Sequence, residues 1–173
     1  MRNLFVSVLL ALSTTIFAAE DTFKAGTLTF QKPASFKSKQ VPPGGMRAAQ
    51  LEYPSADGKS VAEVIFFHFG AGQGGGTQAN VDRWLSAFQE PKDKLNSKVE
   101  KKKVGSSEIT YVEAEGTYMS GMPGGPKTAQ PGSKLSGAIV ESPGGNVYIR
   151  MTGPLATVKA AEADFRKMVE TAK

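Results

Sequence analysis

The 173-residue sequence contains no cysteine and a single histidine, His68. Without cysteine the chain forms no disulfide and no thiolate metal site, and it cannot carry the lipid that bacterial lipoproteins attach to a cysteine after the signal peptide. A Ser-His-Asp triad would have to use His68 as its base. The composition therefore excludes a disulfide-stapled module and a lipoprotein.

A long hydrophobic run is also absent, since about 20 consecutive apolar residues are needed to cross a bilayer. The most apolar stretch, residues 4–17, is shorter and is interrupted by polar residues at 13–15. Arg2 precedes this stretch, and small residues follow it at Ala18 and Ala19. This order is typical of a cleaved signal peptide rather than a membrane anchor.

We therefore expect residues 1–18 to be a signal peptide, with cleavage after Ala18 favoured over cleavage one residue later. Residues 19–173 would remain as a single α+β domain, periplasmic or secreted, with no stable insertion in the membrane. A chain of roughly 155 residues can bury about 68–70% of its unfolded surface, which is enough for a hydrophobic core without disulfide or metal cross-links.

Strong charge of one sign is lacking as well. The 21 Lys and Arg residues exceed the 16 Asp and Glu residues only slightly, giving a formal net charge of +5. These charges are spread along the chain instead of being concentrated on one helix. A dedicated nucleic-acid module is therefore not expected.

The strongest positive pattern lies in residues 61–89. Residues 61–69 are β-branched and aromatic on both alternating faces, which predicts a central strand covered on both sides. A glycine-rich loop, residues 70–79, follows. Asn80 then stands in the N-cap position of a helix. One face of this helix is apolar, through Val81, Trp84, Leu85 and Phe88.

Short strands dominate the remaining chain, and turn dipeptides join several of them into hairpins. A Gly- and Pro-rich loop is expected at residues 119–134, and a C-terminal helix is expected after Gly153-Pro154. The pattern predicts an antiparallel sheet of about seven strands with two main helices. The expected strands are residues 27–30, 46–53, 61–69, 98–104, 108–118, 135–141 and 146–152.

The order of these elements, together with the strings M-R-A-A, N-V-D-R-W and Y-I-R-M-T-G-P, resembles the PsbP-like superfamily and a group of uncharacterised secreted bacterial proteins. The element order is shared over residues 27–172, whereas only these three strings are similar in sequence. The resemblance implies an α/β/α sandwich. Because members of that superfamily are mostly non-enzymatic binding or assembly factors, it also implies an interaction function and supplies no active site.

Two nucleotide-binding patterns nearly fit the glycine loop. Gly70, Gly72 and Gly75 match G-x-G-x-x-G, and Gly76 stands where a phosphate-binding loop requires lysine. A dinucleotide fold additionally needs a parallel βαβ unit with an acidic residue after its second strand. The expected antiparallel sheet does not provide one, so we expect no nucleotide cofactor.

Three further signals each have a structural explanation beside a chemical one. His68 lies on one strand face with Val64 and Phe66, which favours a packed histidine with one hydrogen bond. Glu113 and Glu115 share a strand face, and we expect them to pair across strands with the lysines at 101–103 rather than act as acid and base or bind a cation. Trp84 belongs to the apolar face of its helix, so core packing is expected.

If every element reverses the chain direction, the loops at 31–45, 70–79, 105–107 and 142–145 gather at one end of the sandwich. This end carries the start of the first helix, whose free N–H groups suit an anion. The candidate binding residues there are Gly72, Gly74, Gly75, Gly76, Asn80 and Arg83. Asn80 would be occupied in capping, and Arg83 would be free to contact an anion.

The sequence thus predicts an exported, non-enzymatic binding or assembly module, whose partner is an envelope protein or a small anionic ligand. No catalytic residue, metal site or cofactor is assigned. The alternative is a secreted hydrolase that uses His68 or the Glu113/Glu115 pair.

Export makes a direct prediction for the N-terminus. N-terminal sequencing of the protein recovered from the periplasm or the medium should begin at Ala19 or Glu20, because the small residues that the signal peptidase requires lie at 18 and 19. Recovery of the full-length chain from the cytoplasm would contradict the assignment.

Overall fold

The computed structural model describes residues 21–121 and 124–173, so the predicted signal peptide lies outside the described residues. Seven strands form one sheet in the order β3-β4-β5-β9-β8-β7-β6, and β1 and β2 form a separate two-stranded sheet. The elements are β1 (Thr22–Ala25), β2 (Leu28–Gln31), β3 (Lys37–Lys39), β4 (Arg47–Pro54), β5 (Val61–His68), α1 (Thr77–Leu85), β6 (Asn96–Val104), β7 (Ser107–Ser120), β8 (Thr128–Val140), β9 (Val147–Pro154) and α2 (Leu155–Glu170).

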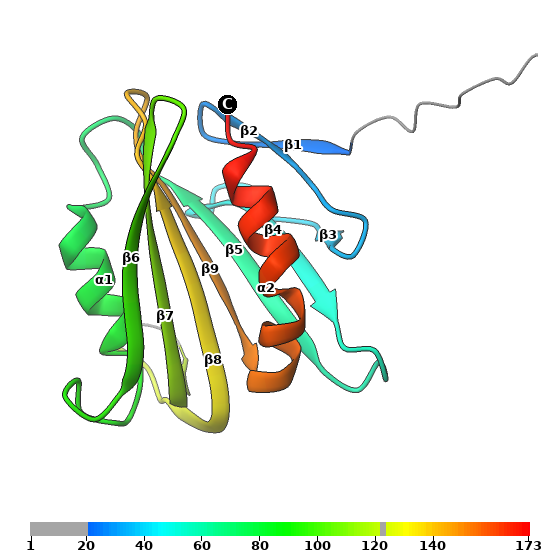
Figure 1. Ribbon diagram of the computed structural model, residues 1–173, viewed down its shortest axis with the longest axis vertical. Helices are drawn as coiled ribbons and strands as arrows, with labels where there is room; N and C mark the ends of the chain where they lie inside the picture. Colours follow the sequence, from blue (N-terminus) through cyan, green and yellow to red (C-terminus); the bar gives the residue numbers. More distant parts are fainter. Residues whose placement is uncertain (1–20, 122–123) are drawn as a thin grey trace, which may run out of the picture.

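The two helices lie on opposite faces of the large sheet, with α2 across the front in Figure 1 and α1 at the left. Each helix buries its own core against the sheet. The larger core contains the apolar face of α2 and the side chains of β1 and β2, whereas the smaller core contains that of α1. Two helices on either side of an antiparallel sheet are the expected α/β/α arrangement. No helix within the described ranges is long and apolar enough to cross a membrane.

The predicted hairpins form with the expected partners. β6 pairs with β7 from Asn96↔Glu115 to Val104↔Ser107, and β8 pairs with β9 up to Val140↔Val147. β9 also pairs with β5, so the last strand of the chain occupies the centre of the sheet. Every strand pair between described residues is antiparallel, so the parallel βαβ unit that a dinucleotide site requires is not formed there.

Several boundaries differ from those expected. β1 and the three-residue β3 were not predicted, because neither carries a long alternating pattern. β8 begins at Thr128, inside the predicted loop, since its first residues continue the pairing with β7 up to Ser120↔Thr128. Helix α1 begins at Thr77 with Gly76 as its N-cap, so the prediction of Asn80 as the N-cap was wrong.

Hydrogen bonds fasten the C-terminal end of the chain to β2. The backbone N–H of Thr29 donates to the carbonyl of Lys173 at 2.9 Å, and the N–H of Lys173 donates back to Thr29 at 3.2 Å. The hairpin β1–β2 is thereby held beside the end of α2, as Figure 1 shows. Phe23 and Phe30 from this hairpin pack on Phe66 of β5, with ring centroids 4.9 and 5.3 Å away.

Trp84 anchors α1 on the sheet, as expected from the apolar face of the helix. The side chain is 5% exposed and its ring lies over Gly137 of β8. A Cβ at position 137 would lie 2.5 Å from Cζ3 of Trp84, a distance that real Cβ atoms do not show. The absence of a side chain at Gly137 therefore makes room for the indole.

Trp84→Ala should lower the free energy of unfolding by about 3–5 kcal/mol, because it removes a large buried side chain and leaves a cavity over Gly137. Urea denaturation measures the change. Val99→Ala on β6, where the side chain is 48% exposed, is the control and should change stability by less than about 0.5 kcal/mol. An unchanged stability of Trp84→Ala would mean that Trp84 is a contact residue rather than an anchor.

Candidate functional site

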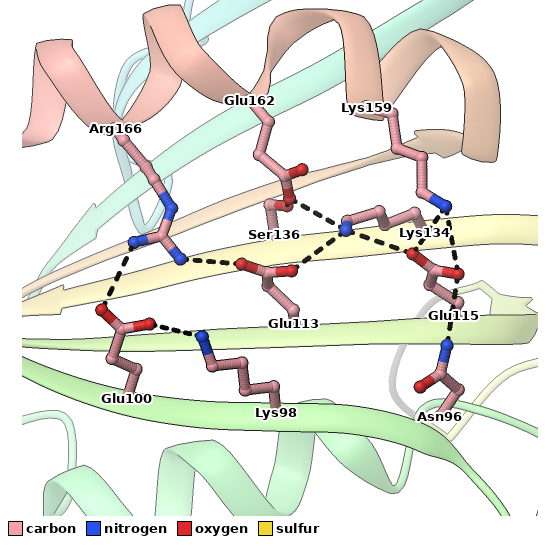
Figure 2. A network of polar contacts seen from close by, with 10 residues as sticks. All are labelled: Asn96, Lys98, Glu100, Glu113, Glu115, Lys134, Ser136, Lys159, Glu162 and Arg166. Carbon is pink, nitrogen blue, oxygen red and sulfur yellow. Dashed lines mark hydrogen bonds and ion pairs between the residues drawn. The ribbon is translucent and has the colours of Figure 1, made fainter.

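The Glu113/Glu115 pair lies on the α2 face of the sheet, around a buried lysine of β8 (Figure 2). Lys134 is 4% exposed, and its Nζ lies 3.1 Å from Glu113, 3.2 Å from Glu115 and 3.0 Å from Glu162 of α2. Charged groups are rarely buried unless they are paired and hydrogen-bonded. Three carboxylates therefore compensate for the burial of this one ammonium group.

Residues of α2 complete the network from above. Arg166 donates to Glu113 at 2.7 Å, and Lys159 lies 3.2 Å from Glu115. Burial alone would raise the pKa of Glu113 and of Glu115. The hydrogen bonds from Arg166 and Lys134 outweigh burial at Glu113, and those from Lys159 and Lys134 outweigh it at Glu115, so both pKa values lie below the ordinary 4.5.

This environment does not suit acid/base chemistry. With a lowered pKa each carboxyl is ionised at neutral pH and has no proton to donate, and its oxygens are occupied by cations. The expected pairing with the lysines at 101–103 was wrong in its partners. Lys101 instead pairs with Glu108 at 2.6 Å, and Lys102 pairs with Glu170 at 2.7 Å. Glu113 and Glu115 face α2 instead, where Arg166 and Lys159 are their partners.

His68 projects from the end of β5 toward the same face of the sheet, and it is partly buried against Gly26. Its Nε2 lies 3.1 Å from the carbonyl oxygen of Gly144, in the turn between β8 and β9. No described serine or threonine hydroxyl is hydrogen-bonded to it. The ring therefore packs against the β1–β2 turn and makes one hydrogen bond to the β8–β9 turn, as the packed-histidine interpretation predicts.

The glycine loop between β5 and α1 is fastened to the sheet. The hydroxyl of Tyr148 donates to the carbonyl of Gly75 at 2.7 Å. Gly74 has φ +86°, and a Cβ there would lie 2.6 Å from the ring of Phe69 and 2.8 Å from that of Tyr148. Only glycine combines this φ with so close an approach to two rings. Figure 1 shows the loop at the same end of the sheet as the β6–β7 and β8–β9 turns, where the alternating directions of the chain predict it.

Asn80 lies in the first turn of α1 and is 3% exposed. Its side-chain amide donates to the carbonyls of Gly74 and Gly76 at 3.0 Å each, which ties the loop to the helix in a different way from the expected cap. Arg83 donates to Oδ1 of Asn80 at 2.9 Å. The side chain of Arg83 remains exposed, and its other N–H groups are not used by this bond.

A groove runs along the α1 face of the sheet, over the strands that α1 does not cover. Its upper part has a volume of about 740 Å³ and is bounded by Gly74, Gly75, Asn80 and Arg83 at the loop end. The lower part, of about 700 Å³, runs toward the other end of β5 and β9. Tyr118, Gly121 and Arg150 line both parts. Of the predicted binding residues, Gly72 and Gly76 do not line it.

Arg150 stands at the junction of the two parts, in the middle of β9. It lies opposite Ile65 of β5 and Gly137 of β8. Its Nε is buried and has no hydrogen-bond partner in the described ranges. Among the described arginines, Arg47 and Arg166 form ion pairs and Arg83 donates to Asn80, whereas Arg150 does neither. A guanidinium in this setting leaves strong donors unused on the floor of a groove.

No protein-family model matches this chain, and no curated protein matches it. Among solved structures, the solution structure of cyanobacterial PsbP (CyanoP) from Synechocystis sp. PCC 6803 aligns over 95% of this chain and 98% of that chain, with a TM-score of 0.55 and 7% sequence identity. The chain has the PsbP-like fold. A crystal structure from Bacteroides thetaiotaomicron aligns over 84% of this chain and 44% of that chain, with a TM-score of 0.44 and 13% identity.

Sequence reasoning missed Arg150 as a candidate. The string Y-I-R-M-T-G-P carries part of the resemblance to the PsbP-like superfamily, and it also contains a charged residue in the interior of a strand. Arg150 shares a face with Tyr148 and Thr152, whereas Ile149 and Met151 are buried under α2. An arginine in the middle of such a strand is a signal for a site, because a central position would otherwise be apolar.

The Lys134 network predicts a pH-dependent loss of stability. Lys134→Met should lower the free energy of unfolding near pH 7 by about 3 kcal/mol, the low end for a broken buried ion pair because the carboxylates are partly exposed. Glu113 and Glu115 have a lowered pKa when folded, so their contribution is present above about pH 4.5 and is lost as the pH falls through their folded pKa values. The difference between wild type and variant should therefore shrink in acid.

Denaturant unfolding at a series of pH values measures this effect. Lys98→Met is the control, because its pair with Glu100 at 2.8 Å is exposed and should contribute less than about 1 kcal/mol. A Lys134→Met variant as stable as wild type at pH 7 would show that the network contributes no net stability.

Proposed function

We propose that this protein is an exported, non-enzymatic binding module of the periplasm or cell exterior, and that its ligand or partner occupies the groove on the α1 face. The observation that carries the proposal is Arg150, whose buried Nε has no partner in the part of the chain that is described. A concave site of this size with one strong polar group on its floor is typical of ligand binding.

The position of the glycine loop, residues 70–79, also supports the groove as the binding site. Gly74, Gly75, Asn80 and Arg83 close the upper end of the groove, and the bonds among them fix its shape. Gly72 and Gly76 contribute indirectly, since they belong to the same loop and Gly76 begins α1. A loop held on a rigid scaffold is where binding usually resides.

The hydrolase alternative has less support from the geometry. His68 and the Glu113/Glu115 pair both belong to the α2 face of the sheet, whereas the groove lies on the α1 face. The carboxylates are held by Lys134 and by cations of α2, and His68 is bonded to a backbone carbonyl. Neither candidate therefore borders the space where a substrate would fit.

Site-directed photocrosslinking tests the proposal in cells that produce the protein naturally. p-Benzoylphenylalanine is placed at Ser86, an exposed residue on the groove wall, and in a second variant at Lys103, an exposed residue of β6 at the far edge of the sheet. Irradiation should give a defined adduct from position 86 and none from position 103, because only the first borders the groove. Mass spectrometry of the adduct identifies what is bound.

Arg83→Ala should weaken the adduct at position 86, since Arg83 closes the upper end of the groove. The same adduct from positions 86 and 103, or none from position 86 while the protein is folded and exported, would contradict the proposed function.

A further inference from the structure

The upper groove has an aromatic wall. Phe67 and Phe69 stack with centroids 6.3 Å apart and an interplanar angle of 9°, and Phe69 contacts Tyr148 at 5.9 Å. Phe69 is 37% exposed and Met46, on the same lining, is 70% exposed. Large apolar side chains that remain exposed in a concave site indicate that an apolar group covers them.

The lower groove is polar by contrast. Glu63, Gln130 and Thr152 contribute to its lining, so an apolar body is better accommodated in the upper part. Glu63 already accepts a hydrogen bond from Gln50 at 2.7 Å and lies 3.8 Å from Arg47. It is therefore engaged with neighbours of β4 and is not a counter-ion for Arg150.

The charges around the groove are complementary to an anion. Among the described residues that line it, one is acidic, Glu63, and four are cationic: Arg47, Arg83, Lys127 and Arg150. Arg150 is the one placed on the floor with unused donors. A guanidinium is most strongly satisfied by a planar acceptor that binds two of its N–H groups at once, as a carboxylate does.

Resting on the proposed function, we infer that the ligand is an amphipathic carboxylate of small-molecule size. Its carboxylate binds Arg150, and its apolar body lies along Phe67, Phe69 and Met46 in the upper groove. The volume of about 740 Å³ falls within the roughly 300–1,000 Å³ of small-molecule sites. The aromatic wall supplies the apolar contact and Arg150 supplies the polar one, so each end of such a ligand has a separate partner.

Three probes with the same twelve-carbon chain separate the contributions: dodecanoate, 1-dodecanol and dodecyltrimethylammonium. Each is titrated below its aggregation or solubility limit into the chain that starts at residue 19, with calorimetry and the fluorescence of Trp84 as readouts. Trp84 is the sole tryptophan of the sequence and lines the upper groove. Dodecanoate should bind at least ten-fold more tightly than dodecanol, and the cationic probe should bind most weakly.

Arg150→Gln should weaken dodecanoate binding and remove the preference for dodecanoate over dodecanol. Lys103→Gln removes one positive charge at the far edge of the sheet and should leave the preference intact, which controls for net charge. Circular dichroism and urea denaturation establish that Arg150→Gln is folded. The comparison of probes on the wild-type chain tests the inference without any variant.

Equal affinities of the wild-type chain for dodecanoate and dodecanol would overturn the inference, and so would an undiminished preference in folded Arg150→Gln. It is also overturned if the wild-type chain binds none of the probes, or if a peptide ending in a free carboxylate binds where dodecanoate does not. A groove-specific adduct at Ser86 in any of these cases would leave the proposed function standing with a different ligand.

Discussion

A sheet of seven strands is too wide for one helix to cover on each face. Adjacent strands lie about 4.8 Å apart, so seven span roughly 29 Å, whereas a helix with its side chains is about 10 Å wide. On the α2 face the β1–β2 hairpin completes the cover, with Phe23 and Phe30 packed on Phe66. On the α1 face no second described element covers β5 and β9. The groove arises from this shortage of cover, and the side chains of these strands become its floor.

The two faces of the large sheet differ in how the charge of a buried cationic side chain is compensated. On the covered face, Lys134 is surrounded by Glu113, Glu115 and Glu162, so its charge is balanced within the chain. On the open face, Arg150 has a buried Nε without a partner in the described ranges. Desolvation of a cation is unfavourable in both places. The carboxylates around Lys134 offset this cost within the chain. At Arg150 the cost is offset only when a molecule outside the chain binds the guanidinium.

Much of the fold follows from local patterns in the sequence. A run of β-branched and aromatic residues identified β5, and the turn residues at 142–145 identified the β8–β9 hairpin. The apolar faces of α1 and α2 were readable because a helix repeats every 3.6 residues. The start of α1 was not readable, since Asn80 looks like a cap but bonds backward to Gly74 and Gly76. Chain reversal placed the glycine loop at the end of the sheet that carries the β6–β7 and β8–β9 turns, as observed, but no sequence pattern indicated the groove. Arg150 was missed because its isolation depends on strands that are distant in sequence.

The position of β9 has a consequence for how the chain acquires its structure. β3, β4 and β5 form one half of the sheet and β6, β7 and β8 form the other, and β9 alone joins them. Contacts such as Phe66↔Ile149 close long loops, and structures dominated by such contacts form slowly. Until β5 pairs with β9, each half exposes a strand edge that is paired in the complete sheet. The floor of the groove, which is shared between β5 and β9, therefore requires both halves to be paired, so a chain in which they are still separate has no groove with which to hold a ligand.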